Sequence, residues 1–543
     1  MHICLSLGHN SSAVLLRKGQ RPIGYEEERL TKKKSDSAFP ERSIDEIFKF
    51  ADVHSDQVET VYISHWFDVF DPQSTENKYY SAKKVRSLFP NALFVDTRID
   101  GLTHHDAHAL SALAFSNHYD ERTSTNKLIA VIDGFGNRGE VASVYKVVDG
   151  MPRLVHRVTG YGNSLGLLYQ YAATAVGMDG MNDVYKFLGY RVHITPEEIE
   201  RCDMLADQIT AKFLVAYMRK WSNEPSALSD GLIDYGKLDR VRESFENYFL
   251  PVIDNDAFRS RIRVGYVVQK VLEDVVIKYI NRFSFDTLLV AGGCFYNVRL
   301  NDVLRRKFRK ATFCVMPLAG DQGAAMGLAF ADHPWVKDSY SDLFWGKRVL
   351  SINALEPTDA IASQIADKIA AGEIINLLQG DMEFGPRSLC NTASLALCRT
   401  DLIDSINTAN GRTTVMPCAP VMLMSNAIDL FSAKDLARTK GSDRFMITAH
   451  NYLPGISTDE LGGAMHRDVD GSHSGRPQLV FDETSFIGRI LTILYQRHGV
   501  RAIVNTSLNI HGSPIIHDCA DLAYLTKHWL ETSDVKFSNY VVR

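Results

Sequence analysis

The pattern of apolar and polar positions predicts two strand–turn–strand units in the first 150 residues. A short apolar run at 2–7 is followed by the polar turn GHNSS and by a second apolar run, AVLL, at 13–16. The same order returns with a strand at 128–132, a turn at 133–140 and a strand at 141–147. Short apolar runs separated by turn residues favour β-hairpins.

Longer periodic segments predict helices further along the chain. Between 164 and 282 apolar residues recur at helical spacing, most regularly over 261–282. A strand at 287–291, the turn Gly292-Gly293 and a helix through 304 follow. The sequence pattern changes near 345–355. Beyond this region, predicted strands at 373–378, 420–424 and 501–504 alternate with predicted helices such as 360–371. We therefore expect two α/β domains, residues 1–350 and 351–543.

Composition narrows the class of protein. The chain has 543 residues, a formal charge of −5, 45% hydrophobic and 23% charged residues, as in ordinary soluble globular proteins. The basic clusters at 32–34 and 305–310 are read as solvated faces, because the net charge gives no general attraction to nucleic acid. Eight scattered cysteines indicate reduced thiols. With no signal peptide and no long apolar run, we expect a cytoplasmic protein without a membrane span.

The segment GLTHHDAHAL gathers three histidines where a helix is expected to begin. Thr103 and Asp106 form a capping-box pattern, so the helix should start near His104. Residues four positions apart share a helix face, which places His104 beside His108. A helix N-terminus disfavours positive charge, so both imidazoles should be neutral, the form that binds a metal. The spacing alone also fits histidines that only form hydrogen bonds at a helix end.

Two aspartates are candidates to complete a metal site. Asp133 ends a predicted strand and enters DGFGNRG, and Asp321 stands in LAGDQGAAMG before another predicted helix. Each fits equally well as a turn residue. Two histidines and two aspartates together would suit Fe(II), Mn(II) or Zn(II).

Glycine turns and arginines indicate sites for phosphates. The turns GHNSS and DGFGNRG, with AGGCFYN after a strand, suggest the layout of a sugar kinase or actin-like ATPase, in which backbone amides approach phosphates. Lys186 is either a point charge for a phosphate or an ordinary surface lysine. In the C-terminal part, polar residues beside Gly/Pro turns and strand ends are candidate anion ligands. These are Arg387, Arg412, Arg476, Asn505, Ser507 and Asn509.

Taken together, these strings resemble the O-carbamoyltransferases of the nodulation, cephamycin and tobramycin type. GHNSSAVLL, YEEERLTKKKSDSAFP, HHDAHALSA, SLGLLYQYAATAVG, AGGCFYN, GDQGAAMG, MEFGPRSL, MPCAP and NTSLNIHGSPI occur in the order of that family. They run from the first ten residues to about residue 516, so the resemblance covers nearly the whole chain.

The resemblance implies an N-terminal actin-like (ASKHA) domain and a C-terminal YrdC-like domain. It implies that carbamoyl phosphate and ATP form carbamoyl-adenylate in the second domain, and that the carbamoyl group then passes to an acceptor hydroxyl in the first. It further implies four metal ligands, with Fe(II) as the expected ion, a histidine base, an adenosine site and an anion site. By matching motifs these are His104, His108, Asp133 and Asp321 for the metal; His9 for the base; Gly292, Gly293 and Asn297 for adenosine, with Lys186 at a phosphate; and Arg387, Arg412, Arg476 and Ser507 for the anions, with Asn505 and Asn509 nearby.

The chain departs from the family pattern in its C-terminal cations. Asp381 stands where the family has an arginine, and Val415 and Cys418 replace aromatic residues. These changes put the details of triphosphate binding in doubt.

Three hypotheses for function are carried forward. The first is carbamoyl transfer to a hydroxyl of a free small molecule or nucleotide. The second is carbamoylation of a hydroxymethylated pyrimidine in DNA. The third is a non-catalytic ATP-binding assembly protein. A homodimer stays open as the assembly.

Overall fold

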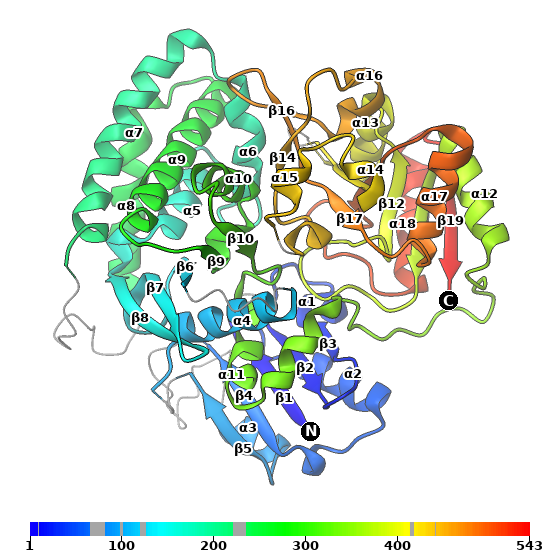
Figure 1. The fold of residues 1–543 in the computed structure, drawn as a ribbon, viewed down its shortest axis with the longest axis horizontal. Helices are drawn as coiled ribbons and strands as arrows, with labels where there is room; N and C mark the ends of the chain where they lie inside the picture. Colours follow the sequence, from blue (N-terminus) through cyan, green and yellow to red (C-terminus); the bar gives the residue numbers. More distant parts are fainter. Residues whose placement is uncertain are drawn as a thin grey trace. The chain divides into compact units, whose positions relative to one another are not determined.

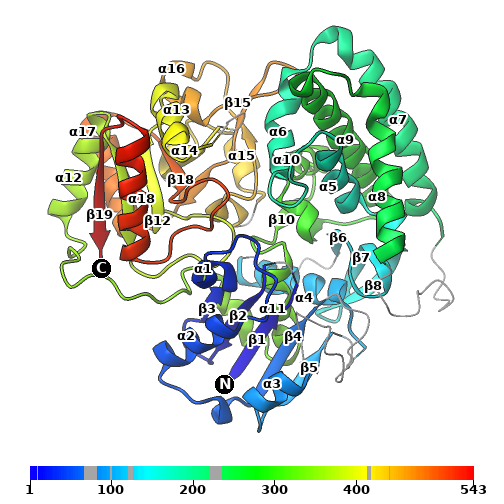
Figure 2. The ribbon, with the colours of Figure 1, turned by 180° about the vertical axis from the view of Figure 1, so that it is seen from behind.

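The chain folds into two compact units (Figures 1 and 2). The computed structural model describes all residues except 9, 66–81, 98–100, 120–125, 221–234, 413–416 and 440. Unit 1 comprises Met1–Pro22 and Ser37–Ser341, and unit 2 comprises Ile23–Asp36 and Asp342–Arg543. The division at 341/342 precedes the expected position 351, and the second unit also takes in a short segment from the N-terminal part of the chain.

The first sheet of unit 1 contains a hairpin followed by parallel strands. β1 (His2–Ser6) pairs antiparallel with β2 (Ser12–Leu16) and parallel with β4 (Thr60–Ser64), which pairs parallel with β5 (Leu93–Asp96). Every residue of β1, β2 and β4 is buried. Strands that are covered on both faces have continuous apolar runs, which is the pattern that the sequence shows here.

The second sheet of unit 1 repeats this arrangement. β6 (Lys127–Ile132) pairs antiparallel with β7 (Glu140–Val148) and parallel with β9 (Thr287–Ala291), which pairs parallel with β10 (Thr312–Val315). β8 (Met151–Thr159) extends the sheet beyond β7. The same hairpin-plus-parallel order in both sheets is the duplicated layout expected of an actin-like domain. The predicted α/β class is therefore confirmed for this unit.

Two helices occupy the space between these sheets. α4 (His104–Tyr119) packs against β6 and β9, and α11 (Ala324–Asp332) packs against β1 and β4. The two helices also pack closely on each other. A Cβ atom at Gly327 of α11 would lie 2.1 Å from the carbonyl oxygen of Ala107 and 2.5 Å from the amide nitrogen of Ser111. Only a glycine allows the two backbones to approach this closely.

A group of helices completes unit 1. α7 (Pro196–Tyr217) packs on α9 (Ala257–Ile280), and α8 (Tyr235–Phe249) packs on α5 (Leu165–Ala175) (Figure 1). α10 (Val298–Lys307) follows β9. This group corresponds to the segment that the sequence predicted as mostly helical. No helix in the described part of the chain is both long enough and apolar enough to cross a membrane.

Unit 2 is built on a six-stranded mixed sheet. Its order is β17 (Gln478–Val480), β13 (Ala419–Leu423), β18 (Ile503–Ser507), β12 (Thr392–Leu397), β11 (Ile374–Gln379) and β19 (Phe537–Val542). α12 (Asp359–Ala370) and α17 (Phe486–His498) contribute to one apolar cluster with the sheet. α13 (Thr400–Ala409) and α18 (Cys519–Thr532) contribute to another. Unit 2 is an α/β domain, as predicted.

Small elements complete unit 2. A second sheet joins β14 (His450–Asn451), β16 (His473–Gly475) and β15 (His466–Arg467). The N-terminal segment of the unit contains β3 (Ile23–Glu26) and α1 (Glu27–Thr31). In α1 the side chains of Glu27, Glu28 and Arg29 are buried, although a run of charged residues ordinarily indicates a solvated surface.

Two expectations about strands need correction. The strand expected at 501–504 runs instead over β18, so Asn505 and Ser507 lie within it and do not follow it. β18 is paired on both sides, with β12 and β13, and its polar side chains have partners inside the unit. β8 was missed, because its sequence MPRLVHRVT carries a proline and two arginines that weaken the strand pattern.

The contact between α4 and α11 predicts a large effect of a single methyl group. We expect Gly327→Ala to lower the free energy of unfolding by about 3 kcal/mol, because the added Cβ overlaps backbone atoms that cannot move independently. Gly162→Ala is the matched control, since a Cβ there meets nothing within 4 Å. Urea unfolding of both variants measures the difference, and equal stabilities would contradict the importance of this contact.

Candidate metal centre and anion site

Four side chains meet in unit 1 with the geometry of a metal site. One ligand atom from each of His104, His108, Asp133 and Asp321 lies within 4.8 Å of the other three, and all four residues are buried. Nε2 of His104 lies 3.1 Å from Nε2 of His108 and 3.2 Å from Oδ1 of Asp321. Nε2 of His108 lies 3.2 Å from Oδ2 of Asp133. The structure thus brings together residues from one helix and two separate turns.

The separations and the donor set fit a divalent cation. Metal–ligand bonds of about 2.1 Å place neighbouring donor atoms about 3.0–3.4 Å apart in octahedral or tetrahedral geometry. Two imidazoles and two carboxylates suit Fe(II), Mn(II) and Zn(II). Two Nε2 atoms facing each other at 3.1 Å cannot both carry protons without repulsion, and a shared cation removes that conflict.

Charge in the cluster differs from the expectation based on the helix N-terminus. Burial alone would lower the pKa of His104, but the carboxylates of Asp321 and Asp133 outweigh burial and raise this pKa to about 10. Without a cation His104 would therefore be protonated at neutral pH, and the prediction of a neutral imidazole is wrong for that state. The physical reason is distance, because full negative charges at hydrogen-bond range outweigh the partial charge of a helix end.

The start of α4 is fixed by the same turn that carries Asp133. The amide of His104 donates to Oδ1 of Asn137 at 2.7 Å, and the amide of His105 donates to Oε1 of Glu140 at 2.9 Å. Glu140 is buried and pairs with Arg157 at 3.1 Å. Helix N-termini leave amides unsatisfied, and here the turn supplies their acceptors. The ligands on α4 and the ligand on the turn are thereby held in one rigid arrangement.

The predicted helix cap is confirmed, and the third histidine has another task. Thr103 and Asp106 exchange reciprocal hydrogen bonds, in which each backbone amide donates to the other side chain. Nδ1 of His105 lies 2.9 Å from Oγ of Ser143, on the side of α4 that faces β7. Burial lowers the pKa of His105 well below its usual value. His105 is therefore a neutral packing residue behind the four candidate ligands.

The predicted adenosine residues are tied to the metal cluster or to helix ends. The amide of Gly293 donates to Oδ1 of Asp133 at 3.2 Å, so the Gly-Gly turn orients a candidate ligand. Gly292 has a φ of 95°, which favours glycine. Asn297 accepts from the amide of Leu300 and caps α10. Lys186 forms an ion pair with Asp183 at 2.8 Å. His9, the predicted base, lies outside the described residues.

Two of the candidate arginines of unit 2 lie close enough for one to influence the charge of the other. Burial, and to a smaller extent the nearby charge of Arg387, lowers the pKa of Arg476 to about 9. Burial raises the pKa of the Cys418 thiol, and the charges of Arg412 and Arg476 act on this pKa in the opposite direction. A guanidinium stays charged at neutral pH. The lowered pKa therefore expresses mainly the burial of the guanidinium and in smaller part repulsion from Arg387, and a bound anion would offset both.

The other predicted anion ligands support this cluster. The guanidinium of Arg412 donates to Oγ1 of Thr506 at 2.8 Å and to Oδ1 of Asn509 at 2.6 Å, and it also reaches Oγ of Ser507 at 3.2 Å. Asn505 was expected to contact the anion, but its buried amide donates to the carbonyl of Ser388 at 2.8 Å and to Gln478. Its amide therefore holds the loop that carries Arg387.

A segment from the N-terminal part of the chain holds the other side of this loop. The amide of Gly385 donates to Oε2 of Glu26 at 3.1 Å, and the guanidinium of Arg29 donates to the carbonyl of Gly385 at 2.7 Å. Both side chains are buried. Oε1 of Glu383 closes the loop by accepting from the amides of Leu389, Asn391 and Thr392.

Sequence reasoning missed these supporting residues. The string YEEER by itself indicates no role at a site, since a charged run ordinarily marks a solvated surface. Asn137 and Glu140 stand inside a turn in which the glycines give the clearest sequence signal. The signal in both places was the same: charged or amide side chains next to a glycine turn, where unpaired backbone groups need partners.

Comparisons with known proteins assign the chain to a family. The profile of the carbamoyltransferase N-terminus matches residues 93–330, and that of the carbamoyltransferase C-terminus matches residues 366–542. The chain belongs to the carbamoyltransferase family. It is thus a transferase, and the resemblance that its motifs suggested is confirmed.

Relatives of this carbamoyltransferase span most of its length. Nodulation protein NolNO of Sinorhizobium fredii is 26% identical, with 94% of this chain and 76% of that protein covered. Nodulation protein NolO of Bradyrhizobium diazoefficiens is 27% identical, with 77% and 75% covered. An uncharacterised protein of Methanocaldococcus jannaschii is 24% identical, with 94% and 93% covered.

Solved structures resemble the chain more weakly. Component A of the (R)-2-hydroxyglutaryl-CoA dehydratase of Acidaminococcus fermentans has a TM-score of 0.34 at 12% identity, covering 63% of this chain and 99% of that one. HypF of T. kodakarensis has a TM-score of 0.32 at 13% identity, covering 62% and 48%.

The cluster predicts that a single histidine decides metal binding. We expect His108→Ala to weaken the binding of Fe(II) or Mn(II) by more than about 100-fold, because even the partners of ligands contribute about 10–100-fold. His118→Ala is the control on the same helix, since His118 lies at the far end of α4. Metal content after dialysis measures both variants. Equal content in the two would show that the cluster is not a metal site.

The hydrogen bonds that Glu26 and Arg29 form with Gly385 predict an effect on anion binding at a distance. We expect Arg29→Ala to weaken the binding of pyrophosphate by about tenfold, because the loop that carries Arg387 loses a charged hydrogen bond. Glu26→Gln keeps an acceptor for Gly385 and should have a smaller effect. Lys33→Ala, in the same segment and 78% exposed, is the control. Calorimetric titration with pyrophosphate measures all three variants. An affinity for pyrophosphate equal to that of the wild type in Arg29→Ala would contradict a role of the contact between Arg29 and Gly385.

Proposed function

We propose that this carbamoyltransferase is an ATP-dependent O-carbamoyltransferase that works in two stages. Unit 2 forms carbamoyl-adenylate, and unit 1 transfers the carbamoyl group to an acceptor hydroxyl. The observation that carries the proposal is the buried cluster of two histidines and two aspartates in unit 1, in a chain whose second unit holds a separate cluster of arginines. The two sites suit two different chemical tasks.

The first stage joins carbamoyl phosphate to ATP. With one water consumed, carbamoyl phosphate and ATP give carbamoyl-adenylate, phosphate and pyrophosphate. Both substrates are polyanions, and Arg387 and Arg476 supply the cations that bind them. Arg412 arranges Ser507 and Asn509 beside them. Preorganised charges of this kind stabilise phosphates without reorganisation during the reaction.

The second stage moves the carbamoyl group to oxygen. The acceptor hydroxyl forms a bond to the carbonyl carbon, the bond from carbon to the adenylate oxygen breaks, and AMP leaves. His9 is proposed to take the hydroxyl proton, and Gly292, Gly293 and Asn297 to hold the adenosine, with Lys186 at a phosphate. His104, His108, Asp133 and Asp321 would hold the divalent cation, for which we propose Fe(II). When bound, the cation supplies Lewis-acid polarisation of a carbonyl or phosphoryl oxygen.

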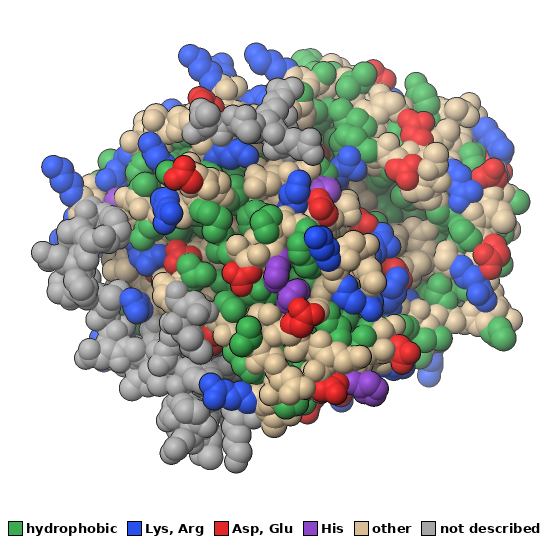
Figure 3. Space-filling model, turned by 60° about the horizontal axis from the view of Figure 1, so that its bottom comes forward, with side chains coloured by type: hydrophobic (Ala, Val, Ile, Leu, Met, Phe, Trp, Pro, Cys, Tyr) green, Lys and Arg blue, Asp and Glu red, His purple; other side chains and the backbone are tan. Residues whose placement is uncertain are grey.

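A free small molecule or nucleotide is preferred over DNA as the acceptor. Within the basic cluster at 305–310, Arg305 is buried and paired with Asp302 at 2.7 Å, and Arg306 pairs with the same aspartate at 3.0 Å. On the face drawn in Figure 3, Lys and Arg side chains are interspersed with Asp and Glu. Neither observation favours a track for a phosphate backbone. The third hypothesis, a non-catalytic assembly protein, is inconsistent with membership of a transferase family.

The test separates the two stages with one variant for each. Enzyme is supplied with ATP, labelled carbamoyl phosphate and a panel of hydroxylated compounds, including hydroxymethylated DNA. We expect Arg387→Ala to reduce the release of pyrophosphate that depends on carbamoyl phosphate by at least about 100-fold. We expect His108→Ala to retain this release and to lose label transfer.

Two outcomes would contradict the proposal. If wild-type enzyme releases no pyrophosphate in response to carbamoyl phosphate, the first stage does not occur. If both variants fail at the same stage, the assignment of one task to each unit is wrong. Label on hydroxymethylated DNA with none on the free compounds would favour the second hypothesis.

A further inference from the structure

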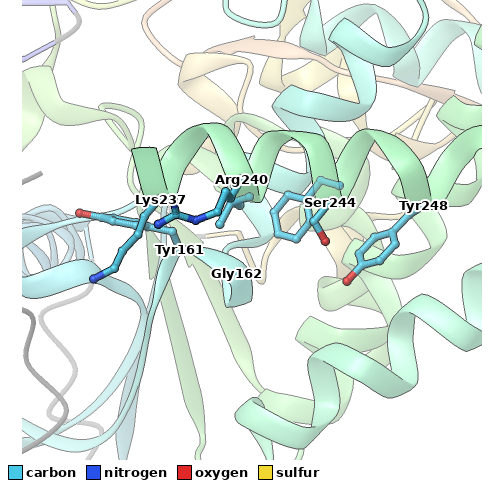
Figure 4. A pocket seen from close by; sticks show the side chains of 8 residues that line it. Tyr161, Gly162, Lys237, Arg240, Ser244 and Tyr248 are labelled. Carbon is cyan, nitrogen blue, oxygen red and sulfur yellow. The ribbon is translucent and has the colours of Figure 1, made fainter. Parts of the chain in front are cut away.

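A pocket of about 310 Å³ opens on the helical part of unit 1 (Figure 4). One wall is a single face of α8, whose lining residues recur at helical spacing from Lys237 to Tyr248. The opposite wall is the turn at Tyr161 and Gly162. The volume is at the lower end of the range for small-molecule sites, about 300–1,000 Å³. The full lining is Tyr161, Gly162, Lys237, Arg240, Val241, Ser244, Phe245 and Tyr248.

The lining combines cations with aromatic rings and contains no carboxylate. Lys237 and Arg240 lie one helical turn apart, and Arg240 makes no ion pair with any residue that the structure describes. Phe245 and Tyr248 pack with their ring centroids 5.8 Å apart. Two cations on one face match a dianion such as a phosphate monoester, whereas a carboxylate would satisfy one of them. The ring of Tyr161, which lies beside the two cations in Figure 4, suits the flat face of a sugar or base.

The wall of the pocket that contains Tyr161 and Gly162 contacts the turn that carries Asp133. The ring of Tyr161 packs edge-on against the ring of Phe135, with centroids 5.2 Å apart. Oγ of Ser164 donates to the carbonyl of Gly134, the residue after Asp133. Gly162 and Ser164 are two residues apart, which spans at most about 7 Å. A molecule in the pocket is therefore close to the turn that positions a candidate metal ligand.

We propose that this pocket binds the acceptor, and that the acceptor is a hydroxylated compound carrying a phosphate monoester and a sugar or aromatic ring. This inference rests on the proposed carbamoyl transfer and gives its acceptor a chemical class. The phosphate pairs with Lys237 and Arg240, the ring lies along Tyr161, which Figure 4 shows beside these two cations, and the free hydroxyl points toward the turn of Asp133. The pocket adds no covalent step, since it only places the hydroxyl that attacks the carbamoyl carbon.

A binding experiment tests the pocket without relying on catalysis. The probes are uridine 5′-monophosphate, uridine and inorganic phosphate, titrated by calorimetry into the full chain. We expect uridine monophosphate to bind more tightly than uridine or phosphate alone. Lys237→Ala combined with Arg240→Ala should weaken it by about tenfold for each cation removed. Both side chains are exposed, so these substitutions leave the core intact.

Two matched variants locate the binding. Arg242→Ala is the control on the same helix, because Arg242 lines no part of the pocket and pairs with Asp239 at 3.3 Å. Arg387→Ala removes the anion site of unit 2 instead. Both should bind uridine monophosphate like the wild type. An affinity that falls in Arg387→Ala and not in the double variant would overturn the proposal.

A second measurement distinguishes this inference from the proposed function. Pyrophosphate release that depends on carbamoyl phosphate is assayed in the same preparations. If it occurs and uridine monophosphate does not bind, the pocket is not the acceptor site, while the first stage stands. If it is absent from the wild type, the proposed function fails and the acceptor role fails with it.

Discussion

The contact between α4 and α11 is backbone against backbone, and the candidate metal centre depends on it. Gly327 lets the two helices approach until a methyl group would overlap Ala107 and Ser111. Asp321 stands in the short turn before α11, and His104 and His108 stand one turn apart at the start of α4. Close packing of the helices therefore brings a carboxylate to two imidazoles that lie more than 200 positions away in the chain. Interiors are packed too tightly to absorb even one extra carbon at such a point.

The same turn serves the helix and the site. Residues 133–140 carry Asp133, and they also provide Asn137 and Glu140 as acceptors for the first amides of α4. Burying two aspartates beside two histidines would be unfavourable without compensating charge. The negative charge of the two aspartates is compensated either by protons on the histidines or by a cation that all four side chains bind. The proposed anion site of unit 2 presents the opposite problem, since positive charges lie near one another there, and the guanidinium of Arg412 is held by neutral hydroxyl and amide oxygens.

How far the sequence predicts this protein depends on whether a signal is local. The capping pair Thr103 and Asp106, the i, i+4 pair of histidines and the strand before Gly292 are local, and each lies where the pattern placed it. Asn505 shows the limit, because a polar residue in a buried strand looks like a strand end until its partners are known. Arg29 shows the same limit of sequence-based prediction. It is a charged residue that is buried because its guanidinium donates to a carbonyl more than 350 positions away.

The sequence by itself determined the α/β class, the helix on which the histidines lie, the candidate ligands and the family. These follow from periodicity and from motif strings, which are properties of neighbouring residues. Only the tertiary structure decided which carboxylates meet the imidazoles, that these carboxylates raise the pKa of His104, and that Glu26 and Arg29 hold the loop of Arg387. Those facts depend on distances of a few ångströms between segments far apart in the chain. Coulomb energies and hydrogen bonds are set by such distances, and no local pattern encodes them.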